Sequence, residues 1–196
     1  NTTYFDTLKD CCHVYTYGVD VLKQFSDNGG NLRNVKFRLH NDTDDCYIIA
    51  EQKDGVYYAK GLTAKKSDAT TFIPNAQGHI VVKGLEDDAY SLTEIATDKG
   101  YVLLKDAVKI VIKTAENGTC EQCGAKLLTA STTVNSKDIT MTEGNAIVPL
   151  TVVNNPGFDL PKTGGYGVWM YTVGGVLLLG AAVFIVIRSR KHKNKQ

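Results

Sequence analysis

The chain has 196 residues, 43% of them hydrophobic, with 22 basic and 21 acidic side chains and a formal net charge of +1. Five of the basic residues and none of the acidic ones follow Ile187, so the part before it has 17 basic and 21 acidic side chains, a net charge of −4. This acidic balance argues against a nucleic-acid partner, because phosphates are bound by a basic surface.

Residues 1–13 precede the first predicted strand, and we expect them to be a remnant of an upstream region or a linker. They contain neither an initiating methionine nor a basic-then-apolar export signal. We therefore expect the chain to be a processed or truncated piece of a longer one.

Residues 14–158 have the length of one domain and the pattern of β structure. Alternating apolar residues predict strands at 15–23, 34–40, 90–96, 107–113 and 147–154. Turn-forming residues separate them at 26–31, 41–45, 53–55, 75–78 and 86–88. Several short strands at this spacing predict an all-β fold, an immunoglobulin-like antiparallel β-sandwich.

Three of the predicted strands carry a polar residue where the period-two pattern continues an apolar face. These are Lys23 in the first strand, Glu94 in the third and Asn154 in the last. Burying a lone charge is costly unless it is paired or neutralised. We expect the three side chains to be buried together. The alternative is that each lies at a strand end and reaches solvent.

Three such residues buried together can react with one another. Burial lowers the pKa of a lysine and raises that of a carboxylic acid, so both can be neutral in a core. The neutral amine of Lys23 is then a nucleophile, and a protonated Glu94 can polarise the side-chain carbonyl of Asn154. Attack, proton relay through Glu94 and loss of ammonia would form a Lys–Asn isopeptide bond. This is a single-turnover reaction, so we do not expect an enzyme.

Three segments resemble the opening strand, the E-box and the closing strand of a Cna-B-type domain, as found at the C-terminus of Gram-positive shaft pilins and adhesin stalks. They are residues 14–41, 84–101 and 150–165. The resemblance implies that Lys23 is the amine donor, Glu94 the catalytic acid and Asn154 the acceptor. The stretch "EIATDKGY" departs from the family because it lacks the Pro common after the E-box Glu. Asn155 stays an alternative acceptor, although strand phase favours Asn154.

Five cysteines leave one unpaired within the chain: Cys11, Cys12, Cys46, Cys120 and Cys123. We expect Cys120 and Cys123 to form a small disulfide loop, with a redox pair or half of a zinc site as alternatives. A structural zinc site is disfavoured because only one C-x-x-C is present and no His pair follows at ligand spacing. The pairing of the other cysteines stays open, and neither a metal nor another cofactor is expected.

Residues 159–165 contain Leu160-Pro161-Lys162-Thr163-Gly164. An uncharged apolar run follows at 166–187, and its roughly 22 residues predict a transmembrane helix. The basic tail at 188–196 is typical of the cytoplasmic side. The three parts together resemble the cell-wall sorting signal of Gram-positive surface proteins.

That resemblance implies that a sortase cleaves between Thr163 and Gly164 after a membrane-held stage. Thr163 would then be joined to an amine of peptidoglycan or of a neighbouring pilin subunit. The first functional hypothesis is therefore a cell-surface pilus (fimbrial) subunit whose isopeptide bond withstands tension. The alternative is the stalk of a wall-anchored adhesin or enzyme whose functional domain lies upstream. Host surface ligands are further candidate partners. The "YPK" lysine motif of shaft pilins does not occur in the chain.

Overall fold

The computed structural model describes residues 13–144, 146–157 and 166–193. It divides into two units, residues 1–157 and 158–196, which are described separately. The all-β prediction is confirmed for the first unit. Its strands are β1 (Tyr17–Phe25), β2 (Lys36–Asn41), β3 (Cys46–Lys53), β4 (Val56–Thr63), β5 (His79–Leu85), β6 (Ala89–Ala96), β7 (Val108–Thr119), β8 (Lys126–Val134), β9 (Lys137–Ile139) and β10 (Ile147–Asn154). A short 3-10 helix, η1 (Leu32–Asn34), precedes β2.

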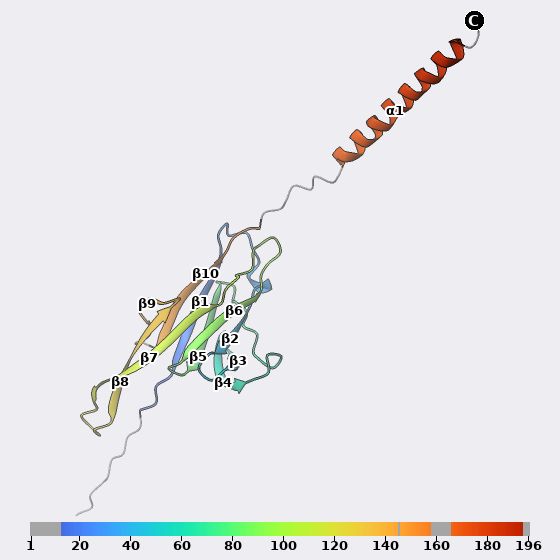
Figure 1. Cartoon of the computed structure of the whole chain (residues 1–196). Helices are drawn as coiled ribbons and strands as arrows, with labels where there is room; N and C mark the ends of the chain where they lie inside the picture. The colour runs from blue at the N-terminus through green and yellow to red at the C-terminus, as the bar shows by residue number, and fades with distance from the viewer. Residues whose placement is uncertain (1–12, 145, 158–165, 194–196) are drawn as a thin grey trace, which may run out of the picture. The chain divides into compact units, whose positions relative to one another are not determined.

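The strands form one mixed sheet in the order β10-β1-β5-β4-β3-β2-β6-β7-β8-β9, folded over its own core (Figure 1). Most neighbours are antiparallel, as predicted. The pairs β1–β10 and β4–β5 are parallel. Parallel neighbours need a crossover connection, and both pairs have one: residues 64–78 link β4 to β5, and most of the unit lies between β1 and β10.

The five predicted strands correspond to β1, β2, β6, β7 and β10, whereas the other five were not predicted. Strands β4 and β8 each contain only one buried residue, so they lack the alternation that marks a half-buried strand. The predicted turn at 53–55 joins β3 to β4. Asp54 (φ 52°) and Gly55 (φ 81°) both have positive φ there, as a two-residue type I′ hairpin requires.

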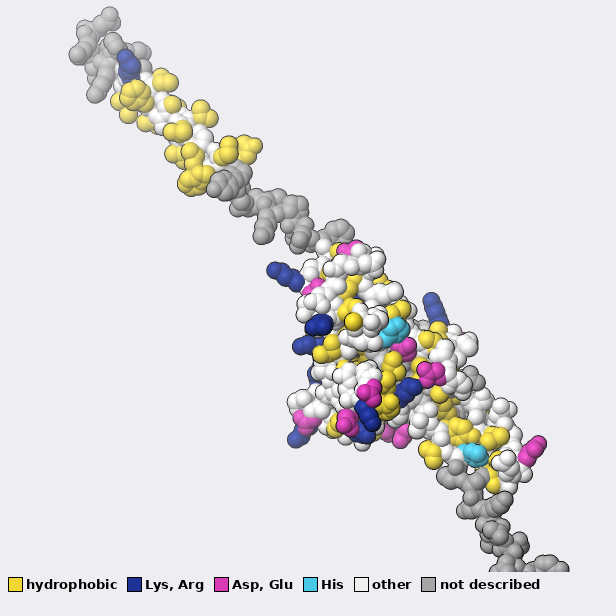
Figure 2. Space-filling model, turned by 180° about the vertical axis from the view of Figure 1, so that it is seen from behind, with side chains coloured by type: hydrophobic (Ala, Val, Ile, Leu, Met, Phe, Trp, Pro, Cys, Tyr) yellow, Lys and Arg dark blue, Asp and Glu magenta, His cyan; other side chains and the backbone are white. Residues whose placement is uncertain are grey.

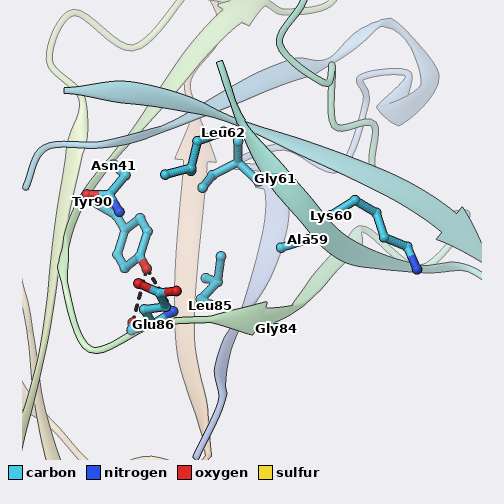
Figure 3. A pocket seen from close by; sticks show the side chains of 10 residues that line it. Asn41, Ala59, Lys60, Gly61, Leu62, Gly84, Leu85, Glu86 and Tyr90 are labelled. Atoms are coloured by element: carbon cyan, nitrogen blue, oxygen red, sulfur yellow. Dashed lines mark hydrogen bonds between the residues drawn. The ribbon is translucent and has the colours of Figure 1, made fainter. Parts of the chain in front are cut away.

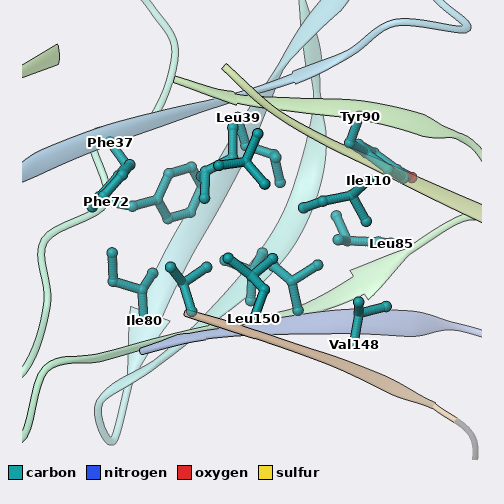
Figure 4. Close-up of a cluster of buried hydrophobic side chains, with 14 of the residues drawn as sticks. Phe37, Leu39, Phe72, Ile80, Leu85, Tyr90, Ile110, Val148 and Leu150 are labelled. Atoms are coloured by element: carbon teal, nitrogen blue, oxygen red, sulfur yellow. The ribbon is translucent and has the colours of Figure 1, made fainter. Parts of the chain in front are cut away.

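The core consists of inward-facing side chains from both layers of the folded sheet (Figure 4). Phe37 and Leu39 of β2, Ile110 of β7 and Val148 of β10 are completely buried. The largest apolar members labelled in the figure also include Phe72, Ile80, Leu85, Tyr90 and Leu150. This core continues along β1, β6 and β10 to the three polar residues singled out by the sequence.

The second unit contains the helix α1 (Tyr166–Lys193). Apolar side chains cover the face of the helix seen in Figure 2, and Trp169 and Met170 are largely exposed. Within the described residues, no helix combines the length and apolar content that crossing a membrane needs. The transmembrane span predicted over 166–187 stays a prediction from the sequence.

Candidate crosslinking site

Lys23, Glu94 and Asn154 lie together at one end of the core. Their side chains are buried, with 1%, 3% and 1% of the residue surface exposed. The alternative that they reach solvent at strand ends is therefore wrong. In the parallel β1–β10 pair, Phe25 is opposite Asn154 and Lys23 is opposite Val152. Lys23 and Asn154 thus share a face of the sheet, two positions apart on adjacent strands.

Glu94 reaches this site from β6, which pairs with β2 and β7 but not with β1 or β10. It faces Asn154 across the core, and the Asn154 Nδ2 donates a hydrogen bond of 2.8 Å to Glu94 Oε2. The same Glu94 oxygen accepts the backbone N–H of Leu104 at 2.8 Å. These contacts hold the carboxyl group beside the side-chain amide of the predicted acceptor.

The amide nitrogen of Asn154 has two further acceptors in the segment between β6 and β7. They are Thr97 Oγ1 and the Val102 carbonyl oxygen, each at 2.9 Å. A carbonyl oxygen cannot donate, so the nitrogen and not the oxygen of the Asn154 amide must face Val102. The sequence predicted a hydrogen bond from Glu94 to the carbonyl of Asn154. The observed contact is instead with the amide nitrogen, because the Val102 carbonyl sets the orientation of the amide.

Two oxygen atoms at the site have no hydrogen-bond partner within the described part of the chain: Glu94 Oε1 and Asn154 Oδ1. Both are fully buried acceptors, and leaving such atoms unsatisfied costs about 1–3 kcal/mol each. A native structure tolerates few of them, and they concentrate at strained or reactive sites. One proton on Glu94 Oε1 would turn one of these acceptors into a donor.

The amine of Lys23 is desolvated. Its Nζ donates to the Gln24 carbonyl oxygen at 2.5 Å and lies 4.2 Å from the ring centroid of Phe25. Burial lowers the pKa of Lys23 below its ordinary value, and the nearby Glu94 carboxylate opposes this only in part. A lowered pKa increases the fraction of neutral, nucleophilic amine.

The segment between β6 and β7 is tied to the loop that follows β1. Asp98 accepts hydrogen bonds from the Asn31 backbone N–H at 2.7 Å and from Asn34 Nδ2 at 2.6 Å. The Tyr101 hydroxyl donates to Asp27 Oδ1 at 2.7 Å. The hydrogen bond from Tyr101 lowers the pKa of Asp27, and the same bond raises the pKa of Tyr101 to about 12. The asparagine contacts lower the pKa of Asp98.

Sequence reasoning did not identify Phe25, Thr97, Val102 and Leu104 as parts of the site. The sequence pattern does contain a signal for Phe25, because this residue continues the inward-facing row of β1 beyond Lys23. The other three lie in an irregular segment and act partly through backbone atoms, for which residue type and periodicity carry no signal.

The alternative acceptor Asn155 is exposed, and its backbone carbonyl accepts the N–H of Val102 at 2.9 Å. This agrees with the strand phase that favoured Asn154.

The predicted disulfide between Cys120 and Cys123 is wrong. Cys123 is disulfide-bonded, but Cys120 and Cys46 are free thiols among the described cysteines. Residues 120–125 form a tight turn, in which the Cys120 carbonyl accepts from the Gly124 N–H at 2.7 Å and the Cys120 N–H donates to Ala125 at 2.7 Å. The sorting residues Leu160, Pro161, Lys162, Thr163 and Gly164 lie outside the described residues.

A pocket of about 250 Å³ lies at a different place, between β4 and the turn that joins β5 to β6 (Figure 3). It is lined by Asn41, Glu86 and Tyr90, among others. The Tyr90 hydroxyl donates to the backbone oxygen of Glu86 and accepts its N–H, both at 3.0 Å. The pocket therefore has a polar wall that is already hydrogen-bonded internally.

A mixed β-sheet folded over one core and followed by a separate C-terminal helix defines a prealbumin-like β domain with an anchor segment. The family model described as SpaA, Prealbumin-like fold domain, matches residues 18–123, and the chain belongs to this family. The model of the LPXTG cell wall anchor motif matches residues 152–194. This motif supports attachment to the cell wall at the surface of a Gram-positive bacterium. No curated protein matches the chain.

Solved structures similar to the chain include three of pilus proteins. The group B streptococcus pilus 2b backbone protein is 22% identical with a TM-score of 0.49, over 74% of this chain and 43% of that one. The shaft pilin SpaA from Lactobacillus rhamnosus GG is 15% identical with a TM-score of 0.47, over 74% and 48%. Its C-terminal domain is 17% identical with a TM-score of 0.44, over 74% and 100%. The chain thus spans less than half of the first two proteins.

Proposed function

We propose that the chain is the C-terminal part of a sortase-anchored pilus subunit that closes its own β domain with a Lys23–Asn154 isopeptide bond. Membership of the prealbumin-like family and the LPXTG anchor motif support the anchored structural role. The observation that carries the crosslink is the burial of an amine, a carboxyl group and an amide at one end of the core. The Glu94 carboxyl group and the Asn154 amide are hydrogen-bonded, and the Lys23 amine is near enough to Glu94 for the charge of the carboxylate to affect its pKa.

The reaction needs no external reagent. Neutral Lys23 Nζ attacks Asn154 Cγ, and a proton leaves Nζ for Glu94. Glu94 passes a proton to Asn154 Nδ2, with which it is already in hydrogen-bond contact. The Cγ–Nδ2 bond then breaks, ammonia departs, and Glu94 returns to its starting state. The lowered pKa of Lys23 supports the first step.

The direction of the strands supports a mechanical role for the bond. Because β1 and β10 are parallel, their first residues are neighbours at one end of the pair and their last residues are neighbours at the other end. The chain enters the domain at the first end, through β1, and leaves it at the second end, through β10. Tension would therefore enter and leave at opposite ends of the pair and shear β1 against β10. A bond from Lys23 to Asn154 would carry that tension covalently. Strands β2–β9, which lie between β1 and β10 in the sequence, would then bear none of it.

The anchoring step is proposed to join Thr163 to an amine of the next subunit or of peptidoglycan after cleavage before Gly164. This rests on the anchor motif and on the sequence, because the motif residues lie outside the described ranges. A membrane-held stage before sorting stays a prediction from the sequence.

Intact-mass measurement tests the crosslink. The chain is expected to be lighter by one ammonia than its sequence predicts, and Glu94→Ala is expected to restore the full mass. Glu86→Ala, which changes an exposed carboxylate, is the control and should keep the deficit. A wild-type chain of full mass would refute the bond.

Immunoblots of wall extracts test the anchoring and the pilus. A high-mass ladder that disappears in a sortase-deficient strain is expected. A single wall-linked band would contradict the pilus subunit and favour a stalk.

A further inference from the structure

The amide nitrogen of Asn154 has more acceptors than it has hydrogens. Glu94 Oε2, Thr97 Oγ1 and the Val102 carbonyl surround Nδ2 at 2.8, 2.9 and 2.9 Å. A side-chain amide carries two N–H groups, so three acceptors exceed what the unreacted asparagine can satisfy. All three acceptors can receive a hydrogen bond at the same time only if the nitrogen gains a third hydrogen.

The nitrogen gains one in the reaction proposed above. After Nζ attacks Cγ and Nδ2 takes a proton, the leaving group is an ammonium with three N–H groups. Three acceptors then match three donors, and each hydrogen bond is strengthened by the positive charge. The surroundings of Nδ2 are thus more complementary to the leaving group than to the starting amide, which is what accelerates a chemical step.

We propose that Thr97 is a further catalytic residue for the crosslink, whose hydroxyl is the third acceptor for the departing nitrogen. The inference rests on the proposed crosslinking function and extends it. Unlike the Val102 carbonyl, this acceptor is a side chain and can be removed. It is also half-buried rather than solvated, so water does not readily replace it.

The segment that carries Thr97 is held in place by contacts with the loop that follows β1. The same segment carries Asp98 and Tyr101, whose hydrogen bonds join it to the loop directly after β1, the strand of Lys23. The rings of Phe25 and Tyr101 also pack at a centroid distance of 4.3 Å. These contacts tie the segment that carries Thr97 to the loop that follows Lys23.

The rate of crosslinking tests the role of Thr97. The full chain is made by cell-free synthesis and sampled over time by intact mass, which follows loss of ammonia. Thr97→Val, which keeps the shape but removes the hydroxyl, should slow the reaction at least about tenfold, the effect of one hydrogen bond to a charged group. Thr97→Ser keeps the hydroxyl and should react within about threefold of wild type. Thr93→Val, on the exposed face of β6, is the matched control.

Folding and chemistry are separated by repeating the Thr97 substitutions in a Lys23→Met background, where no crosslink forms. Melting temperatures equal to that background show that the variants fold, and Thr97→Ala is a second hydroxyl-free variant if Thr97→Val does not. Crosslinking of a folded hydroxyl-free variant at the wild-type rate would overturn the role of Thr97 alone. Absence of the ammonia deficit in wild type would instead overturn the proposed function.

Discussion

Two buried asparagines of this domain, Asn41 and Asn154, have opposite surroundings. Asn41, 2% exposed at the end of β2, uses its full hydrogen-bonding capacity. Its Nδ2 donates to Asp44 at 3.2 Å and to Asp88 at 2.8 Å, and its Oδ1 accepts the N–H groups of Thr43 and Asp44. The Asn154 nitrogen has three hydrogen-bond acceptors around it, whereas its carbonyl oxygen has no hydrogen-bond partner among the described residues.

The difference distinguishes a structural asparagine from the one proposed to react. A fully paired amide such as that of Asn41 stabilises the turn between β2 and β3 and gains nothing from changing its bonds. The Asn154 oxygen, by contrast, has no hydrogen-bond donor among the described residues, and its nitrogen has three acceptors for two hydrogens. The desolvated amine of Lys23 lies on the adjacent strand. Both asparagines are buried, so incomplete hydrogen bonding, rather than burial, is the feature that distinguishes the proposed acceptor Asn154 from Asn41.

The largest expected effect is that of Asn154→Ala. The substitution removes the acceptor, and the proposed bond would enclose about 130 residues, a closure that adds roughly 5 kcal/mol to the free energy of unfolding. Chemical denaturation should show a loss of about that size, together with full intact mass. A variant that keeps both its stability and the ammonia deficit would contradict the assignment.

Asn41→Ala is expected to have a smaller effect of a different kind. The loss of its hydrogen bonds should lower the free energy of unfolding by about 1–3 kcal/mol, because the turn amides lose their buried partner. The ammonia deficit should stay complete in intact-mass spectra. Loss of the deficit here would show that the two asparagines are not functionally distinct.

The buried amine of Lys23 predicts a pH dependence of the free energy of unfolding. In Asn154→Ala, Lys23 remains unreacted, and its lowered pKa means that the unfolded chain binds a proton that the folded chain does not. The free energy of unfolding should therefore rise with pH from the lowered pKa up to the ordinary lysine value of 10.5, by at most about 1.4 kcal/mol per pH unit. The same stability is lost as the pH falls through this window.

Urea denaturation at a series of pH values measures this slope. Lys23→Met in the same Asn154→Ala background removes the titrating amine and is the control. Equal slopes in the two proteins would mean that Lys23 is not held in a desolvated state.

The smallest expected effect is that of Asn155→Ala. This exposed side chain neighbours the acceptor, so its loss should change the free energy of unfolding by no more than about 0.5 kcal/mol. Peptide mapping should still find Lys23 joined to Asn154 in this variant. Loss of the crosslinked peptide would transfer the acceptor role to Asn155.

The sequence by itself determined much of the β fold and the inward-facing positions of the three side chains of the proposed crosslink. Strand alternation is a local property, set by the extended backbone, so it placed Lys23, Glu94 and Asn154 on inward faces before any pairing was known. It did not predict β4 and β8, each of which has a single buried residue, and it misassigned the disulfide of Cys123.

Only the tertiary structure decided how those side chains meet. The parallel pairing of β1 with β10 depends on contacts between the two ends of the domain. The orientation of the Asn154 amide depends on the Val102 carbonyl and the Thr97 hydroxyl, which an irregular segment delivers. Such non-local contacts follow from the packing of the whole domain, because neither residue type nor periodicity encodes where a loop places its atoms.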